Sequence, residues 1–219
     1  MSILYSYHKG RYIGTQELLN EGGRHRIDKI YVNITNQCPC RCTFCIRSQE
    51  NAAEFDDLWL TAEPAVEEVL QEFDRLDLTP IKEVIFCGYG EPLTRLKEVL
   101  EISKALKSRK NLKIRINTNG LGSLIHGFDI VPALKNFIDS ISISLNASNA
   151  AEYLKLTRSS FGMESYDAVI RFAVECRDQL KEVRVTVVDI IGREEIEKCR
   201  ELCDAHRLDL VVRKFIMTL

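Results

Sequence analysis

Glycine and proline are scarce in this sequence, with eleven and five residues among 219. This low content excludes collagen-like repeats and argues against long disordered segments. No run of eighteen apolar residues is present, which excludes a membrane-spanning helix. The first residues, MSILYSYHKGRYIG, are too polar and too interrupted for a signal peptide. We therefore expect a soluble protein of the cytoplasm with no membrane partner.

A large excess of charge of either sign is also missing. Thirty Lys and Arg residues against 32 Asp and Glu residues leave a net charge of −2 at pH 7, unlike the strongly basic proteins that coat nucleic acids. Apolar side chains make up 45% of the chain, and this length suits one core better than two. We expect one core domain over residues 29–219, preceded by a hairpin or lid over residues 1–28.

Short β-branched runs alternate with helical patterns along the chain. The expected strands cover residues 29–35, 83–87, 112–117, 140–145, 183–189 and 208–215. The expected helices cover residues 61–74, 94–107, 130–136, 165–180 and 193–206. Thr61 is the expected N-cap of the first helix, with Pro64 in its first turn.

Six strands joined by helical crossovers imply parallel pairing. A closed barrel of eight such units needs ~250 residues, more than this chain has. The sequence therefore predicts an α/β fold, a partial TIM-type barrel of about six parallel β/α units with a short N-terminal extension. A flat, doubly wound sheet is the alternative. In both folds, functional residues gather at the carboxyl ends of the strands.

Eight cysteines stand out in a chain of this class, and four of them fall in the segment QCPCRCTFC. In a reducing compartment such cysteines bind metals, catalyse or lie buried. Cys38, Cys42 and Cys45 follow the first strand with the spacing C-x3-C-x2-C, so their thiolates can converge on one soft metal centre. A structural zinc site with Cys40 as fourth ligand is the alternative. Three thiolates on a four-iron cluster leave one iron open for chemistry.

Polar and glycine residues also follow the other expected strands. Gly88-Tyr89-Gly90-Glu91-Pro92 ends the second strand, where glycines allow close approach of a ligand to the backbone. Asn117 and Asn119 end the third strand, and Ser144 and Asn146 share one face at the end of the fourth.

The cysteine spacing, with Phe44 just before the last cysteine, resembles the signature of the radical S-adenosylmethionine (radical SAM) superfamily. The resemblance implies that Cys38, Cys42 and Cys45 hold a [4Fe–4S] cluster and that SAM chelates its fourth iron. It also implies contacts to SAM from residues that match the family's other motifs, namely Phe44, Gly88, Tyr89, Gly90, Glu91, Asn117, Asn119, Ser144, Asn146, Arg158 and Ile190.

Several of these implied contacts have a stated role in the family. The GYGEP segment is similar to a Gly-Gly-Glu motif that binds the amino group of SAM, with Tyr89 in place of the middle glycine. Arg158 suits the SAM carboxylate, because guanidinium groups bind carboxylates bidentately. Ile190, Gly192 and Glu195 resemble an adenine motif whose first glycine is replaced here by Val188.

The function implied by the resemblance is reductive cleavage of SAM to a 5′-deoxyadenosyl radical, which abstracts hydrogen from a substrate that the sequence does not identify. An external donor of the flavodoxin or ferredoxin type would supply the electron. The alternatives are an activating enzyme that installs a glycyl radical on a partner protein, and a non-catalytic zinc or iron–sulfur module. The segments YVNITN, FCGYGEP and SLNA are most similar to the TatD-associated radical SAM proteins, which suggests a functional link to a TatD-type nuclease.

The remaining cysteines have simpler interpretations. Cys176, Cys199 and Cys203 lie on apolar helix faces, where buried cysteine is common. Cys87 ends a buried strand and faces either the core or the site, and Cys40 is expected not to be a ligand.

Overall fold

A computed structural model of the chain describes residues 3–8, 11–20, 27–48 and 58–215. Its strands form one sheet in the order β2-β1-β3-β4-β5-β6-β7-β8. Their bounds are β1 Leu4–His8, β2 Arg11–Gly14, β3 Lys29–Val32, β4 Glu83–Phe86, β5 Lys113–Thr118, β6 Ser140–Ser144, β7 Glu182–Val188 and β8 Leu210–Arg213.

The strands from β3 to β8 pair in parallel, which confirms the six parallel strands expected from the sequence. From β3 to β8, each strand neighbours the next one along the chain, with no reversal of order. A doubly wound sheet reverses its strand order at a switch point, so the order agrees with a barrel. Among the described strands, β2 and β8 form the two free edges, and the fold is a partial TIM-type barrel.

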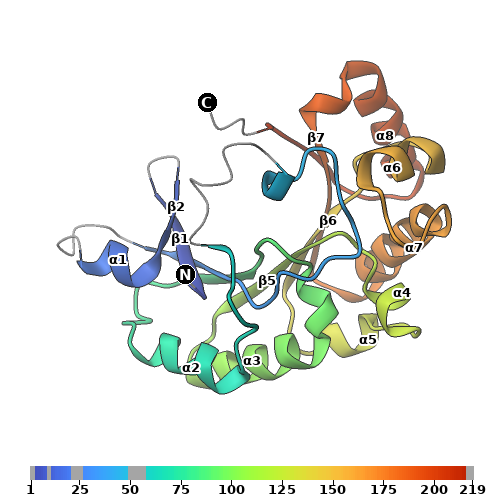
Figure 1. Cartoon of the computed structure of the whole chain (residues 1–219). Coiled ribbons are helices and arrows are strands. Elements are labelled where there is room, and N and C mark those ends of the chain that lie inside the picture. The colour runs from blue at the N-terminus through green and yellow to red at the C-terminus, as the bar shows by residue number, and fades with distance from the viewer. Residues whose placement is uncertain (1–2, 9–10, 21–26, 49–57, 216–219) are drawn as a thin grey trace.

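Helices lie in an arc along the outer side of the curved sheet, as Figure 1 shows. Their bounds are α1 Thr15–Asn20, α2 Val66–Asp74, α3 Leu96–Arg109, α4 Gly122–His126, α5 Val131–Leu134, α6 Ala150–Thr157, α7 Glu164–Gln179 and α8 Arg193–Ala205. Three 3-10 turns complete the described elements, η1 Ile46–Ser48, η3 Pro92–Arg95 and η4 Asp189–Ile191.

The core lies between the sheet and this arc of helices. Every residue of β4 is buried, and β5 alternates between buried and half-buried positions. Val84, Ile114 and Ile141 from successive strands are fully buried and pack with residues of the helices, such as Phe172 of α7. This packing gives the strands a rigid frame, and the loops at their carboxyl ends rest on it.

The prediction that the first helix begins at Thr61 was wrong. Helix α2 begins at Val66, and its N-cap is Ala65, whose backbone N–H donates to the carboxylate of Glu68 at 2.7 Å. Residues before it are held in an extended course, because Asn36 makes hydrogen bonds to both the N–H and the carbonyl of Leu60. Tertiary contacts therefore override the local helical pattern.

The N-terminal strands extend the sheet beside β3. Strand β1 pairs antiparallel with both β2 and β3, and the Tyr5 hydroxyl donates to the carbonyl of Cys87 at 2.8 Å. Helix α1 follows β2 and was not expected from the sequence. The division of the chain into a lid over residues 1–28 and a core domain stays a prediction.

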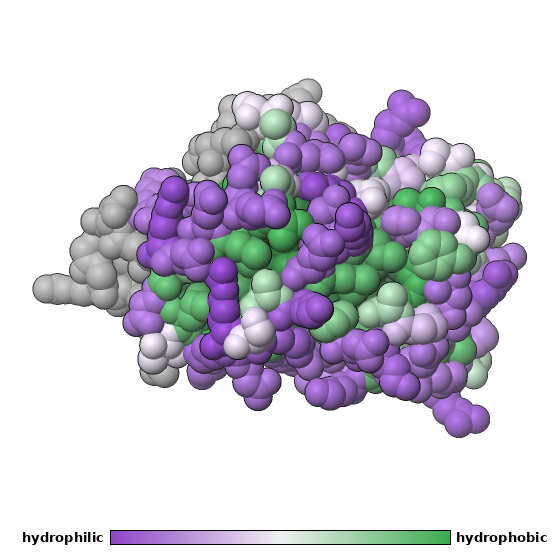
Figure 2. Space-filling view, turned by 90° about the horizontal axis from the view of Figure 1, so that it is seen from below, coloured by the Kyte–Doolittle hydropathy of each residue, from purple (hydrophilic) through white to green (hydrophobic). Residues whose placement is uncertain are grey.

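The outer surface over the helices is mainly polar. Seen from below the view of Figure 1, hydrophilic side chains border an apolar area across the middle of the molecule (Figure 2). Half-buried apolar residues such as Val66, Leu70 and Leu100 pack against the core from the helical layer.

None of the described helices is both long and apolar enough to cross a membrane.

Candidate functional site

Residues 38–45, here called the cysteine loop, follow β3 and rest on the end of α6. The backbone N–H groups of Arg41 and Thr43 donate to the carbonyls of Thr157 and Leu156, both at 2.9 Å. The N–H of Ser160 donates to the carbonyl of Pro39 at 2.9 Å. The last carbonyls of a helix have no partner within the helix, so α6 offers acceptors that fix the course of the loop.

Three thiols of the loop interact with one another. The thiol of Cys40 hydrogen-bonds to both Cys38 and Cys42. This bond is the main cause that lowers the pKa of Cys38, to about 6, and it also lowers the pKa of Cys42. The same bonds raise the pKa of Cys40, because losing its proton would break them. Burial raises the pKa of Cys45. Cys38 and Cys42 are thus biased toward the thiolate, the form that binds metals.

The thiols are not gathered around one metal ion. In the part of the chain that the structure describes, no three cysteine, histidine or acidic side chains form a group that could hold one. The assignment of Cys38, Cys42 and Cys45 as ligands therefore rests on their donor chemistry and on their common loop.

Asn119, at the end of β5, reaches the cysteine loop. Its side-chain amide donates toward the sulfur atoms of Cys38 and Cys40, both at 3.8 Å, a normal distance for a hydrogen bond to sulfur. Its side-chain oxygen accepts from the N–H of Leu121 at 2.9 Å, which fixes the direction of the amide. The structure thus brings one of the expected SAM contacts into direct contact with the thiols.

Glu91 is buried, and its carboxylate oxygens are already bound by the protein. One oxygen accepts from the N–H of Leu93 at 3.0 Å and from the hydroxyl of Thr118 at 2.7 Å, and the other accepts from the N–H of Asn119 at 2.6 Å. Burial raises the pKa of Glu91 to about 7, although these hydrogen bonds oppose the rise. Glu91 therefore ties the end of β4 to the end of β5 and positions Asn119.

Gly88 and Gly90 allow close packing rather than open space for a ligand. A Cβ atom on Gly90 would lie 2.4 Å from the carbonyl oxygen of Thr35 and 2.7 Å from that of Gln37. A Cβ atom on Gly88 would lie 2.1 Å from the side-chain oxygen of Asn33. The glycines therefore let the GYGEP turn lie against the chain that enters the cysteine loop.

Tyr89, between these glycines, belongs to a rim of aromatic and basic side chains. Its carbonyl accepts from the guanidinium of Arg47 at 3.2 Å, and its ring lies 5.9 Å from that of Trp59. The Arg47 guanidinium also lies 5.2 Å above the ring of Trp59. Trp59 was not recognised from the sequence, because no local pattern reports its contact with Tyr89.

Near the ends of β6 and β7, two of the expected polar residues, Asn146 and Glu195, bind the backbone of a neighbouring segment. Asn146 is buried with a positive φ of 61°, and its side-chain oxygen accepts from the N–H of Val188 at 3.1 Å. Glu195 accepts from the N–H of Ser148 at 2.7 Å. Ser144 is half-buried next to Thr186 of β7.

The other expected SAM contacts lie around the same edge of the sheet. Arg158 ends α6 in a left-handed conformation with an exposed side chain, and Ile190 is 46% exposed in η4. Phe44 and Asn117 are half-buried, in the cysteine loop and in β5. The roles of these four residues stay predictions.

The cysteines outside the loop agree with their expected places. Cys176, Cys199 and Cys203 are fully buried, which confirms them as core residues. Cys87 is half-buried at the end of β4. All eight cysteines of the chain are free thiols.

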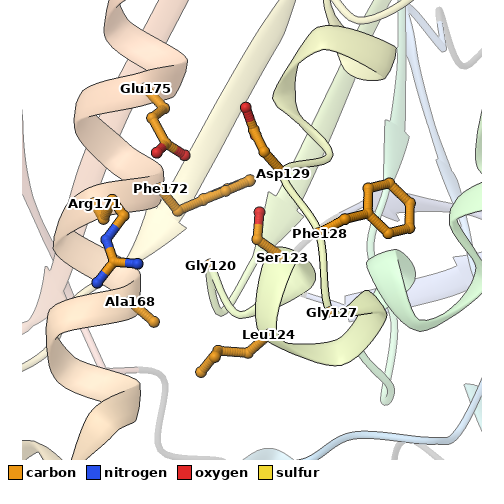
Figure 3. Close-up of a pocket in the computed structure, with 10 residues that line it drawn as sticks. All are labelled: Gly120, Ser123, Leu124, Gly127, Phe128, Asp129, Ala168, Arg171, Phe172 and Glu175. Atoms are coloured by element: carbon orange, nitrogen blue, oxygen red, sulfur yellow. The ribbon is translucent and has the colours of Figure 1, made fainter.

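A hollow of about 310 Å³ lies apart from the cysteine loop, between α4 and α7 (Figure 3). Phe128 and Asp129 border it on one side, and Arg171 and Glu175 of α7 border it on the other. Burial and the nearby Asp129 raise the pKa of Glu175. No residue of the cysteine loop lines this hollow, so it is distinct from the candidate site.

Residues 32–205 match the family model of the radical SAM superfamily, and the chain belongs to this superfamily. Its cofactors are accordingly a [4Fe–4S] cluster and SAM. Among curated proteins it is similar to GTP 3′,8-cyclases. It is 26% identical to that of Lactiplantibacillus plantarum, covering 78% of the chain and 48% of the relative. It is 29% identical to that of Corynebacterium glutamicum, and the match covers 84% of the chain and 47% of the relative. The chain thus spans about half the length of these relatives.

Solved structures share the fold at low sequence identity. Methylornithine synthase (PylB) superposes with a TM-score of 0.59 at 15% identity, over 90% of this chain and 56% of that one. The protein anSMEcpe with bound AdoMet superposes with a TM-score of 0.58 at 17% identity. The match covers 86% of this chain and 51% of that one. These relatives do not bear on the narrower resemblance to TatD-associated proteins, and the link to a TatD-type nuclease stays a prediction.

The residues present fit an iron–sulfur cluster. The cysteine loop offers three thiols that the sequence assigns as ligands, and the pKa values of two of them are lowered. Asn119 adds an amide donor that points at sulfur, as is common around iron–sulfur centres.

Proposed function

We propose that this chain is the catalytic core of an enzyme that cleaves SAM reductively and abstracts hydrogen from a substrate. The observation that carries this proposal is the cysteine loop, in which thiols of lowered pKa lie beside the amide of Asn119. Held by Cys38, Cys42 and Cys45, the cluster would supply the electron for reductive cleavage of a carbon–sulfur bond of SAM, which gives methionine and a 5′-deoxyadenosyl radical for hydrogen abstraction.

In this proposal the residues of the protein hold the cluster and orient the groups around it. Cys38, Cys42 and Cys45 bind the cluster as thiolates. Asn119 donates toward the Cys38 sulfur, and Glu91 holds Asn119 through its backbone N–H. The predicted SAM contacts lie at the carboxyl ends of neighbouring parallel strands, the edge at which such folds bind their ligands.

Anaerobic reconstitution with iron and sulfide, followed by dithionite and SAM, tests the proposal. We expect 5′-deoxyadenosine from the wild-type protein and none above background from a Cys42→Ala variant. Equal yields from the two proteins would contradict it. Metal analysis separates the main alternative, because one zinc ion with no brown chromophore would favour a non-catalytic binding module.

GTP is the first substrate to test, because the curated relatives are GTP 3′,8-cyclases. We expect GTP to raise the yield of 5′-deoxyadenosine above the level with SAM alone and to be consumed. An unchanged yield would exclude GTP. If a glycyl radical signal then appeared on a co-purifying protein, the activating-enzyme alternative would be favoured.

We further propose that an acidic electron donor of the flavodoxin or ferredoxin type docks beside the cysteine loop. Arg41, Lys155 and Arg158 are exposed there, and clustered positive charge steers acidic partners. A Lys155→Glu variant should slow turnover with flavodoxin and leave turnover with dithionite unchanged, because Lys155 is exposed on α6 and lies outside the cysteine loop. The matched control is Lys104→Glu, which reverses an exposed charge on α3. Equal slowing by both variants would contradict this docking face.

A cytoplasmic location is part of the same proposal. It is supported by the eight free thiols, which a reducing compartment preserves. Fractionation of cells that express the full chain would test it, and recovery of the protein outside the cytoplasmic fraction would contradict it.

A further inference from the structure

Tyr153 is a buried residue of α6 that the proposed function does not yet use. Its side chain is only 1% exposed, and its carbonyl accepts from the hydroxyl of Thr157, the residue whose own carbonyl holds Arg41 of the cysteine loop. Within the described residues the Tyr153 hydroxyl has no hydrogen-bond partner. A buried hydroxyl without a partner is unfavourable, and in native structures such a group calls for a specific explanation.

Tyr153 lies on α6, the helix whose last carbonyls hold the cysteine loop. Burial raises the pKa of Tyr153 most, and the charges of Cys40, Cys42, Glu91 and Cys38 raise it further. Tyr153 lies one turn before Thr157 on α6, and the carbonyls of Leu156 and Thr157 accept from the backbone N–H groups of Thr43 and Arg41. The unpaired donor therefore lies on the helix that holds the cysteine loop.

Tyr166 of α7 provides an internal comparison. Its ring lies 5.9 Å from that of Tyr153, but its hydroxyl donates to the carbonyl of Ser148 at 2.5 Å. Of these two neighbouring phenols, one has its partner in the protein and the other does not.

We propose that the hydroxyl of Tyr153 donates a hydrogen bond to a sulfur atom of the iron–sulfur cluster that the cysteine loop holds. This inference rests on the proposed function, because the acceptor is present only when the cluster is bound. A donor to sulfur stabilises the more negative, reduced cluster and so raises its reduction potential. Tyr153 thereby makes the cluster easier to reduce by the external donor.

The experiment compares the reconstituted wild-type protein with a Tyr153→Phe variant in a redox titration followed by electron paramagnetic resonance. The variant removes only the hydroxyl oxygen. We expect iron and sulfide contents equal to wild type and a midpoint potential shifted to a more negative value. We also expect a proton that exchanges in D2O and couples to the reduced cluster in the wild type to be missing from the variant.

The matched control is Tyr166→Phe, which removes the same atom from the neighbouring ring and should leave the potential and the coupled proton unchanged. A midpoint potential equal to wild type in the Tyr153→Phe variant would overturn the inference. A wild-type protein that binds no cluster would overturn it together with the proposed function. A cluster-loaded protein that makes no 5′-deoxyadenosine would contradict the proposed function alone, and the potentials would still decide on Tyr153.

Unfolding of the cluster-free proteins gives a second readout that does not depend on the cluster. The Tyr153→Phe variant should be at least as stable as wild type without the cluster, because the lost hydroxyl had no partner there. Tyr166→Phe should be less stable, because it loses the hydrogen bond to Ser148. A cluster-free Tyr153→Phe variant that is clearly less stable than wild type would show that the hydroxyl already has a partner, and would overturn the inference.

Discussion

Cys40 lies between two of the residues assigned as cluster ligands and differs from both. Its thiol is the proton donor that lowers the pKa values of Cys38 and Cys42, and its side chain is buried. A Cys42→Ala variant should therefore lose the cluster, whereas a Cys40→Ala variant should keep it. Iron and sulfide analysis after anaerobic reconstitution, with the brown absorbance as a second measure, checks both.

Each of the two alanine variants serves as the control for the other, because both remove one thiol from the same loop. Loss of the cluster in both would make Cys40 a fourth ligand, in line with the zinc-type alternative. Retention in Cys42→Ala would contradict the assignment of the C-x3-C-x2-C ligands.

Glu91 should make the stability of the protein depend on pH. Between pH 4.5, its ordinary pKa, and about 7, its pKa in the folded protein, the folded form is protonated and the unfolded chain is ionised. Folding takes up a proton in this window, so the contribution of Glu91 to stability is complete below pH 4.5 and is lost as pH rises through 7. The full loss is on the order of 3 kcal/mol.

A Glu91→Gln variant isolates this effect from the titration of the cysteines. Wild type should be more stable than the variant at pH 5, and this advantage should shrink toward pH 8. Denaturant unfolding of the cluster-free proteins across this range measures the difference. A difference that stays constant with pH would contradict the raised pKa.

Residue identities within the site were partly readable from the sequence. The three cysteines form a local spacing, so their loop was found. The roles of Glu91 and Tyr153 were not, because two of the partners of Glu91 lie at residues 118 and 119 and the cysteine loop lies more than a hundred residues before Tyr153. Those contacts depend on strand register and on the packing of α6, which no local pattern encodes.

At the scale of elements, the turn after β4 should tolerate no side chain at residue 90. Gly90→Ala would bring a Cβ atom within 2.4 Å of the Thr35 carbonyl and should destabilise the protein by about 1–3 kcal/mol. It should also lower cluster loading, because it displaces the chain at Gln37, next to Cys38.

The control for this variant is Gly162→Ala. Gly162 has a φ of +65°, and a Cβ atom there would meet no other atom within 4 Å, so alanine adds only backbone strain of about 1–2 kcal/mol. Unfolding and iron analysis should show similar destabilisation but normal cluster loading. Equal loading in both variants would contradict the link between the turn and the loop.

Helix α6 supports the cysteine loop through the carbonyls at its end, so the loop depends on the stability of this helix. The side chain of Asn149 caps this helix by accepting from the N–H of Glu152 at 3.0 Å. Asn149→Ala should lower the free energy of unfolding by about 1 kcal/mol, and Asn149→Asp, which keeps a capping oxygen, should not. Denaturant unfolding measures both, and equal losses would contradict the capping role.

Helices and strands were predicted correctly where their sequence pattern is local. The predictions failed where tertiary contacts decide the local structure. The six parallel strands follow from β-branched runs, and their ends agree within a few residues. The start of α2 was misplaced, because the hydrogen bonds of Asn36 hold residue 60 in an extended course. Helix α1 lacked a clear apolar repeat and was missed.

At the scale of the whole molecule, SAM should stabilise the folded, cluster-loaded protein. A ligand at a hundred times its dissociation constant adds about 2.7 kcal/mol. In a protein of this size that corresponds to a rise in the melting temperature of about 5–10 °C. Thermal unfolding of the reconstituted protein with and without SAM measures the rise.

The Cys42→Ala variant serves as the control for this measurement. It should show little or no rise with SAM, because the cluster that SAM chelates is lost. An equal rise in both proteins would mean that SAM binds without the cluster and would contradict this mode of binding.

The hydrogen bonds between the cysteine loop and residues 156–160 also determine when, during synthesis of the chain, the loop can take up its folded conformation. A ribosome makes Cys38 to Cys45 long before it makes the carbonyls of Leu156 and Thr157 that fix their backbone. Until those residues are made, the thiols lie on a loop whose backbone is not yet fixed. They are then exposed to oxidation and to binding of the wrong metal ion. Delivery of iron and sulfide by an assembly factor would therefore have to wait until α6 has left the ribosome and docked.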